Sequence, residues 1–192
     1  MTKVFIDGSQ GTTGLKIFDR LKKRDDIELI TVPDELRKDA AARKQAICDA
    51  DIAFLCLPDA AAIEAANLAS DCDTVIIDTS TAHRTSDGWT YGFPEIFENG
   101  FEKISSSKRI ASPGCYASGF IALVKPLIDN NIVSPDCNFY CHAMSGYSGA
   151  GKKGIALYEN DEIPLELCSP REYALTQEHK HLKEMKKISG LS

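Results

Sequence analysis

The chain has 192 residues, of which 43% are hydrophobic, enough for the core of one domain or a little more. Its formal net charge at pH 7 is −6 and it has no basic run, so neither nucleic acid nor a membrane surface is an expected partner. No segment approaches the roughly 20 apolar residues of a membrane-spanning helix. Because the chain starts as a strand leading into a glycine loop, and not as a signal peptide, we expect a cytoplasmic protein.

Short apolar segments alternate with helix-forming segments through the first half of the chain. Strands are predicted at residues 3–7, 27–32, 51–57 and 73–78, and helices at residues 13–23, 39–49 and 60–69. Continuous apolar strands separated by helices are typical of a parallel sheet buried on both faces. With right-handed crossovers, this pattern predicts an α/β fold with a doubly wound, Rossmann-like parallel sheet.

The pattern changes near residue 114. A helix is predicted at residues 115–128, a strand at 136–144 and a glycine-rich loop at 145–154. We therefore expect two domains. Residues 1–113 are predicted to form a Rossmann-like nucleotide-binding domain, and residues 114–192 the start of a second, incomplete α+β domain.

Three glycines, Gly8, Gly11 and Gly14, lie between the first predicted strand and the first predicted helix. In this position glycines let the backbone approach a pyrophosphate, which then lies at the helix N-terminus. The spacing is GxxGxxG instead of the common GxGxxG, and the alternative is a tight turn without a ligand. The sequence therefore indicates a dinucleotide site.

The residues after the second predicted strand leave the choice of dinucleotide open. An acidic side chain there would bind the ribose hydroxyls of NAD, whereas an arginine would accept the 2′-phosphate of NADP. Asp34 and Glu35 favour the first reading, and Arg37 and Lys38 favour the second. A solvated loop is the alternative for any one of them.

Cys115 follows Pro113 and Gly114 and opens an apolar, helix-like segment. Free N–H groups and the positive end of the helix dipole favour an anion there, so the pKa of this thiol is expected to be lowered. The alternative is a small buried residue that packs in the core. The seven cysteines include no CxxC pair, so we expect reduced thiols and not a disulfide or zinc framework.

Six segments in one order resemble the shorter sequence type of the N-acetyl-γ-glutamyl-phosphate reductase family. They are GSQGTTG (8–14), IDTSTAHR (77–84), YGFPE (91–95), SPGCYASG (112–119), SGYSGAGKK (145–153) and EHKHLKEM (178–185). Aspartate-semialdehyde dehydrogenase belongs to the same wider group. Members of the family are longer, so the chain resembles their N-terminal three-fifths.

The resemblance implies an NADP-dependent enzyme of arginine biosynthesis that reduces N-acetylglutamyl phosphate to the aldehyde. It implies a small-molecule substrate, NADP as the cofactor, and a homo-oligomer in the full-length form. Cys115 would be the nucleophile that forms a thioester. His179 would be the acid/base and His181 a substrate contact, although the reverse assignment stays open.

The resemblance also implies the remaining contacts. Cofactor contacts are expected from Gly8, Gly11, Thr12, Thr13, Gly14, Pro58, Ser148 and Gly149, and substrate contacts from Ser80, Arg84, His181 and Tyr173. Arg84 would clamp an anionic group of the substrate, with an ordinary surface arginine as the alternative. No metal is expected, because the His-x-His pair has no further ligand at a zinc spacing.

Other functions compatible with the sequence are an aspartate-semialdehyde dehydrogenase-like enzyme, an inactive dinucleotide-binding fragment and a Cys/His acyl hydrolase. The glycine loop argues against the hydrolase, which needs no nucleotide.

Overall fold

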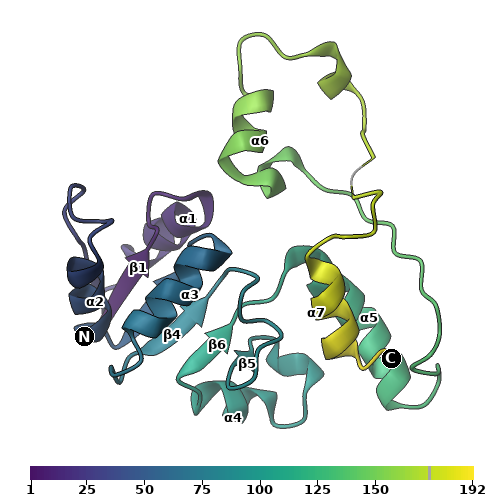
Figure 1. Ribbon diagram of the computed structural model, residues 1–192, viewed down its shortest axis with the longest axis horizontal. Helices are drawn as coiled ribbons and strands as arrows, with labels where there is room; N and C mark the ends of the chain where they lie inside the picture. Colours follow the sequence, from purple (N-terminus) through teal and green to yellow (C-terminus); the bar gives the residue numbers. More distant parts are fainter. Residues whose placement is uncertain (173) are drawn as a thin grey trace.

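The computed structural model describes residues 1–172 and 174–192, and its centre is a six-stranded parallel sheet (Figure 1). The strands are β1 (Thr2–Asp7), β2 (Ile27–Ile30), β3 (Ile52–Leu55), β4 (Val75–Asp78), β5 (Thr90–Tyr91) and β6 (Arg109–Ala111). Their order is β2-β1-β3-β4-β6-β5, and every neighbouring pair is parallel. The predicted parallel α/β fold is therefore confirmed. The short strands β5 and β6 were not predicted.

The connecting helices are α1 (Thr12–Leu21), α2 (Ala40–Cys48), α3 (Asp59–Leu68) and α4 (Gly100–Ser105), with a short 3₁₀ turn, η1 (Pro94–Ile96), before α4. The first three have the expected positions, whereas the fourth, α4, and the 3₁₀ turn before it were not predicted. The core between the sheet and helices α2 and α3 is rich in alanine, which lets both helices approach the strands closely. Its buried side chains include Phe5, Ala46, Ile47, Ala53, Leu55, Ala65 and Ile76.

Two more helices, α5 (Cys115–Asp129) and α7 (His181–Ser189), pack against each other beside the sheet (Figure 1). Ala117 and Ile121 of α5 bury their side chains with Met185 of α7 and Tyr91 of β5. This packing brings the C-terminal segment next to the start of α5. None of the helices in the described residues is long and apolar enough to cross a membrane.

The segment between α5 and α7 differs from its prediction. Residues 136–144 form no strand, and their side chains are mostly exposed. No strand of the described sheet lies beside them, so their backbone groups have no ladder to join. The predicted glycine-rich loop contains a 3₁₀ turn, η2 (Tyr147–Ala150), and helix α6 (Gly151–Tyr158); another turn, η3 (Leu165–Cys168), follows. Helix α6 stands apart from the sheet in Figure 1.

The prediction that all cysteines are reduced thiols is wrong for one pair. Cys48, the last residue of α2, and Cys72, in the turn after α3, form a disulfide with a Cα–Cα distance of 5.2 Å. Helices α2 and α3 are neighbours, so their C-terminal ends meet although 24 residues separate the two cysteines. Sequence spacing alone does not reveal this pairing because it depends on how the helices pack.

Candidate active site

The glycine loop joins β1 to α1 at the carboxyl end of the sheet. A Cβ atom added to Gly8 would lie under 3.0 Å from the carbonyl oxygen of Cys56, and Gly8 has a φ of +85°. A Cβ atom on Gly14 would lie equally close to the carbonyl oxygen of Gly8. The loop therefore has room for glycine only at these two positions. It lies where the strand order reverses between β1 and β3, the usual ligand position in such sheets.

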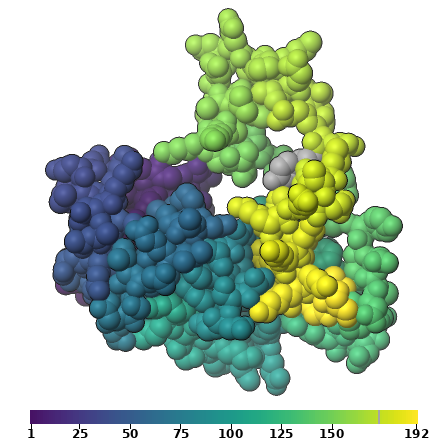
Figure 2. Space-filling model, in the orientation of Figure 1, coloured from purple at the N-terminus to yellow at the C-terminus, as the bar shows by residue number. Residues whose placement is uncertain are grey.

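A cavity of about 830 Å³ opens beside this loop. Its lining includes the predicted cofactor contacts Gly11, Thr12, Thr13, Pro58, Ser148 and Gly149, together with Ser80. Ser148, Gly149 and Gly151 reach this cavity from the η2–α6 segment, the green part above the hollow visible in Figure 2. The structure thus brings together residues from four distant parts of the sequence. Residues that contact one ligand must lie close together in this way.

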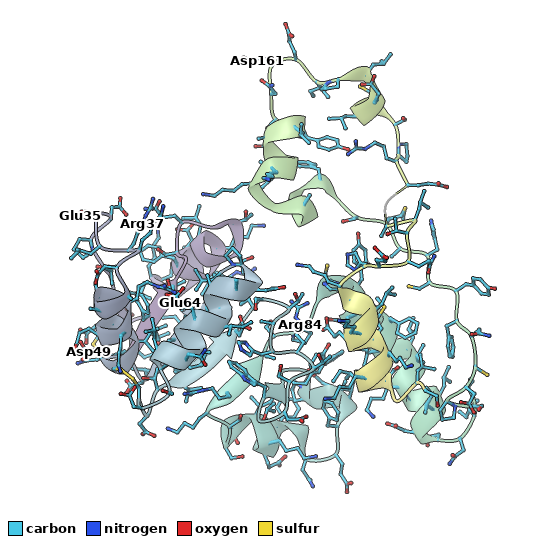
Figure 3. All side chains as sticks on the ribbon, in the orientation of Figure 1. Glu35, Arg37, Asp49, Glu64, Arg84 and Asp161 are labelled. Atoms are coloured by element: carbon cyan, nitrogen blue, oxygen red, sulfur yellow. A yellow bond between two sulfur atoms is a disulfide. The ribbon has the colours of Figure 1, made fainter. Side chains whose placement is uncertain are left out.

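A second cavity, of about 260 Å³, lies on the β2 side of the same loop. Gly8 and Gly11 line it with Asp34, Arg37 and Lys38. Gln10 links the charged residues, since its amide donates to Asp34 at 2.7 Å and accepts from Arg37. Arg37 lies at the rim of the molecule, beside Glu35, in Figure 3. Acidic and basic side chains share this cavity, so the geometry leaves the choice between NAD and NADP open.

A buried ion pair supports the glycine loop from below. The Nε and Nη2 atoms of Arg43 donate to one carboxylate oxygen of Asp7 at 3.0 and 2.9 Å, and Asp7 directly precedes Gly8. Both side chains are almost fully buried. Burial raises the pKa of Asp7, and the hydrogen bonds from Arg43 partly offset this effect. Cys56 of the same region is a neutral thiol, because burial raises its pKa to about 11.

Cys115 is the first residue of α5 and is exposed. Gly114, which caps the helix, has an extended backbone, and no side chain of its own caps the free N–H groups. The next residue, Tyr116, has its ring 5.6 Å from that of His179 and 5.8 Å from that of His181. The two imidazole rings are 4.6 Å apart. Two imidazoles therefore lie beside the residue that follows Cys115 at the N-terminus of α5.

The two histidines have different surroundings. His181 is 6% exposed, and burial lowers its pKa to about 4, so its imidazole is neutral near pH 7. Its Nδ1 atom has no hydrogen-bond partner among the described residues. Its Nε2 atom lies against Gly114, where an added Cβ atom would approach it to within 3.0 Å. His179 is partly exposed and accepts a hydrogen bond of 3.2 Å from the backbone N–H of His181.

Known proteins of one family resemble this chain in sequence. Residues 31–104 match the model of the semialdehyde dehydrogenase NAD binding domain, and residues 115–191 match that of the semialdehyde dehydrogenase dimerisation domain. Curated relatives are named N-acetyl-gamma-glutamyl-phosphate reductase in Burkholderia orbicola (44% identity) and N-acetyl-gamma-glutamyl-phosphate reductase 2 in Pseudomonas putida (46% identity). Each alignment covers 98% of this chain and 60% of the relative.

The chain belongs to the semialdehyde dehydrogenase family, since the two domain models together match most of its length. The resemblance stated from the sequence motifs is thus confirmed. Among solved structures, aspartate semialdehyde dehydrogenase II from Vibrio cholerae aligns over 100% of this chain and 67% of its own, with a TM-score of 0.62 and 17% identity. At that identity the likeness concerns the fold alone. The chain spans about 60% of the length of its curated relatives.

The surroundings of Arg84 argue against one of the two alternatives considered from the sequence, the ordinary surface arginine. Arg84 is 8% exposed, so it is not an ordinary surface arginine. Its guanidinium donates to the carbonyl oxygens of Ser112 (2.8 Å) and Thr79 (3.0 Å) and to a carboxylate oxygen of Glu184 (3.1 Å). A substrate contact by Arg84 stays a prediction. All three of its nitrogen atoms bind protein groups in this structure.

The remaining predicted substrate residues have varied positions. Ser80 is buried, lines the larger cavity and donates its hydroxyl to Asp78 at 2.7 Å. Tyr173 lies outside the described residues. No three His, Cys, Asp or Glu side chains within residues 1–172 and 174–192 are grouped to hold a metal ion.

Several buried polar residues next to the predicted site residues were not predicted from the sequence, chiefly Asp7, Arg43, Tyr91 and Glu184. A signal existed for two of them. Asp7 ends an apolar strand directly before the glycine loop, and Glu184 lies three residues after His181 on one helix face. Tyr91 and Arg43 carry no such signal, because their partners are distant in sequence.

Proposed function

We propose that the chain carries the catalytic centre of an NADPH-dependent reductase that converts N-acetyl-γ-glutamyl phosphate to N-acetylglutamate 5-semialdehyde in arginine biosynthesis. The observation that carries this proposal is the exposed Cys115 at the uncapped N-terminus of α5, with the imidazoles of His179 and His181 beside the following residue. The names of the curated relatives supply the substrate.

The glycine loop fits a dinucleotide. Gly8 and Gly14 leave no room for a side chain, so the backbone of the loop can lie directly against a pyrophosphate. Thr12, Thr13, Ser148 and Gly149 would hold the phosphates and the nicotinamide half in the larger cavity. The choice of NADP over NAD comes from the family resemblance, and Arg37 and Lys38 in the smaller cavity are cations that suit a 2′-phosphate. When bound, the reduced cofactor supplies the hydride.

Cys115 carries the covalent steps. Its thiolate attacks the γ-acyl carbon, the C–O bond to phosphate breaks, and inorganic phosphate leaves a thioester on the sulfur. Hydride addition to the thioester carbon gives a thiohemiacetal, whose C–S bond then breaks to release the aldehyde. The negative oxygen formed in each addition is stabilised by the free N–H groups at the start of α5.

A proton must be supplied to that oxygen and removed again when the thiohemiacetal collapses. We assign this acid/base role to His179, which is partly exposed and lies beside Tyr116. His181, neutral and buried against Gly114, is assigned to positioning the substrate. A variant pair separates the roles. His179→Gln should lower kcat more than it raises KM, and His181→Gln should mainly raise KM; the opposite result would exchange the assignments.

The reverse reaction tests the proposed function. We expect phosphate-dependent reduction of NADP⁺ by N-acetylglutamate semialdehyde, with much slower reduction of NAD⁺. Preference for aspartate semialdehyde would indicate the aspartate-semialdehyde dehydrogenase reaction instead. NADPH binding without any turnover would indicate a dinucleotide-binding chain that lacks the reaction.

Residues 115–191 correspond to a dimerisation domain, so we also propose that the full-length form is a homo-oligomer. Light scattering on the purified protein measures its mass in solution, and a monomer at all concentrations would contradict this proposal.

A further inference from the structure

The carboxylate of Glu184 joins three separate parts of the molecule at the start of α5. One of its oxygens accepts hydrogen bonds from the hydroxyl of Tyr91 (2.6 Å) and the backbone N–H of Gly114 (2.8 Å). The other accepts from Nη1 of Arg84 at 3.1 Å. Glu184 is 2% exposed, so these donors replace the water that an ionised carboxylate requires. Figure 3 shows Arg84 between the sheet and helix α7.

Both charges of this ion pair lie at the residue before Cys115. Glu184 contacts the N–H of Gly114, and the Arg84 guanidinium occupies the space where a Cβ atom on Gly114 would be. Gly114 itself is buried. The pair therefore holds the N-cap residue of α5 from outside the helix, and the N–H groups of the first turn stay without a capping side chain.

The other titratable groups facing this point do not cancel either charge. Burial lowers the pKa of His181, which keeps its imidazole neutral. Burial and the nearby Glu184 carboxylate raise the pKa of Tyr91, so its phenol stays a neutral donor. His179 and Lys180 also act on His181, but His179 is partly exposed and Lys180 is exposed, so solvent screens both of them. The local field at the start of α5 is thus set mainly by Arg84 and Glu184.

We propose that Arg84 and Glu184 form a positioning pair whose opposite charges hold Gly114 in place and set the reactivity of the Cys115 thiol. Arg84 favours the thiolate, and Glu184 opposes it. The inference rests on the proposed function only in taking Cys115 as the reacting group. In this role, neither Glu184 nor the buried Arg84 needs to contact the substrate.

Two variants that each remove one charge test the pair. Glu184→Gln keeps an oxygen acceptor for Gly114 and Tyr91 but leaves the Arg84 cation unbalanced. Arg84→Met leaves the carboxylate unbalanced. At fixed pH, brief iodoacetamide labelling of Cys115 should become about threefold or more faster in the first variant and about threefold or more slower in the second. The double variant should return close to the wild-type rate.

Controls come from the chain itself. The exposed thiols Cys137, Cys141 and Cys168 serve as internal references when labelled peptides are quantified by mass spectrometry. Glu178→Gln removes an exposed carboxylate just before α7 and should leave the Cys115 rate within twofold of wild type. The proposal would be overturned if the Cys115 labelling rate changed in the same direction in both single variants, or in neither. A general loosening of the structure would change both rates in the same direction, whereas removal of opposite charges changes them in opposite directions.

A further variant covers the case in which a single charge deletion prevents folding. Tyr91→Phe keeps both charges but removes one donor from the carboxylate, so its negative field increases and Cys115 should react more slowly; an unchanged rate would contradict the proposal. The labelling needs neither substrate nor cofactor. If the two variants shift the Cys115 labelling rate in opposite directions but the protein has no reductase activity, the positioning pair stands and the proposed function is wrong. If the protein has reductase activity but the labelling rates do not shift in opposite directions, the proposed function stands and the positioning pair is wrong.

Discussion

Replacing Arg43 by methionine tests whether the buried ion pair supports the glycine loop. The substitution keeps much of the side-chain volume but leaves Asp7, 4% exposed, without its cation. Removing one partner of a buried pair costs roughly 3–5 kcal/mol, because the remaining charge has neither water nor a counterion. The second partner of Arg43, Glu64, is 55% exposed at its side chain, so its loss should add little.

Urea denaturation followed by circular dichroism measures this free energy of unfolding. Lys44→Met is the matched control, since the neighbouring residue pairs with Asp71 at an exposed site (43% and 64% side-chain exposure) and should lose about 1 kcal/mol or less. Asp7→Asn/Arg43→Met removes both charges and should recover part of the loss. A loss below about 1 kcal/mol for Arg43→Met, equal to the control, would refute the reasoning.

Three further outcomes are expected. Gly14→Ala should weaken NADPH binding, measured by fluorescence titration, at least tenfold, because its Cβ atom would press on the carbonyl of Gly8; unchanged affinity in a folded variant would remove the loop from the site. The His181 imidazole should titrate near pH 4 in NMR, so its contribution to stability is present above about pH 6.5 and is lost as pH falls toward 4; a midpoint near 6.5 would contradict its burial. At pH 9, Cys56 should react with a thiol reagent far more slowly than exposed Cys137, since burial raises the pKa of Cys56 to about 11; equal rates would show that the thiol is accessible.

Local residue patterns predicted the elements whose type depends on their own sequence and not on distant partners. Continuous apolar strands such as residues 51–57 and alanine-rich helices such as 60–69 have the predicted types, and β3 (Ile52–Leu55) and α3 (Asp59–Leu68) differ only at their ends. The glycine loop was also readable, because strand, glycines and helix are contiguous. The cofactor contacts from Pro58 and Ser148 came from the family resemblance, and the structure places both on one cavity.

Features that depend on distant partners could not be read from the sequence. The disulfide between Cys48 and Cys72 follows from how α2 and α3 pack, and β5 is only two residues long. Glu184 looks like one of many acidic residues on a charged helix until α7 docks on α5. The segment 136–144 has strand-like residues, yet a strand also needs a neighbour, and periodicity carries no information about that neighbour.

The most direct test of the central claim is the covalent state of Cys115 during the reverse reaction without phosphate. With NADP⁺ and N-acetylglutamate semialdehyde, the thiol adds to the aldehyde, hydride leaves to NADP⁺, and the acyl group has no phosphate to accept it. We predict at most one equivalent of NADPH per chain and, by peptide mass mapping, an N-acetylglutamyl group on Cys115 alone. Cys115→Ser should give neither, since its hydroxyl is not ionised near neutral pH. NADPH formation without an acylated Cys115, or acylation of another residue, would contradict the account.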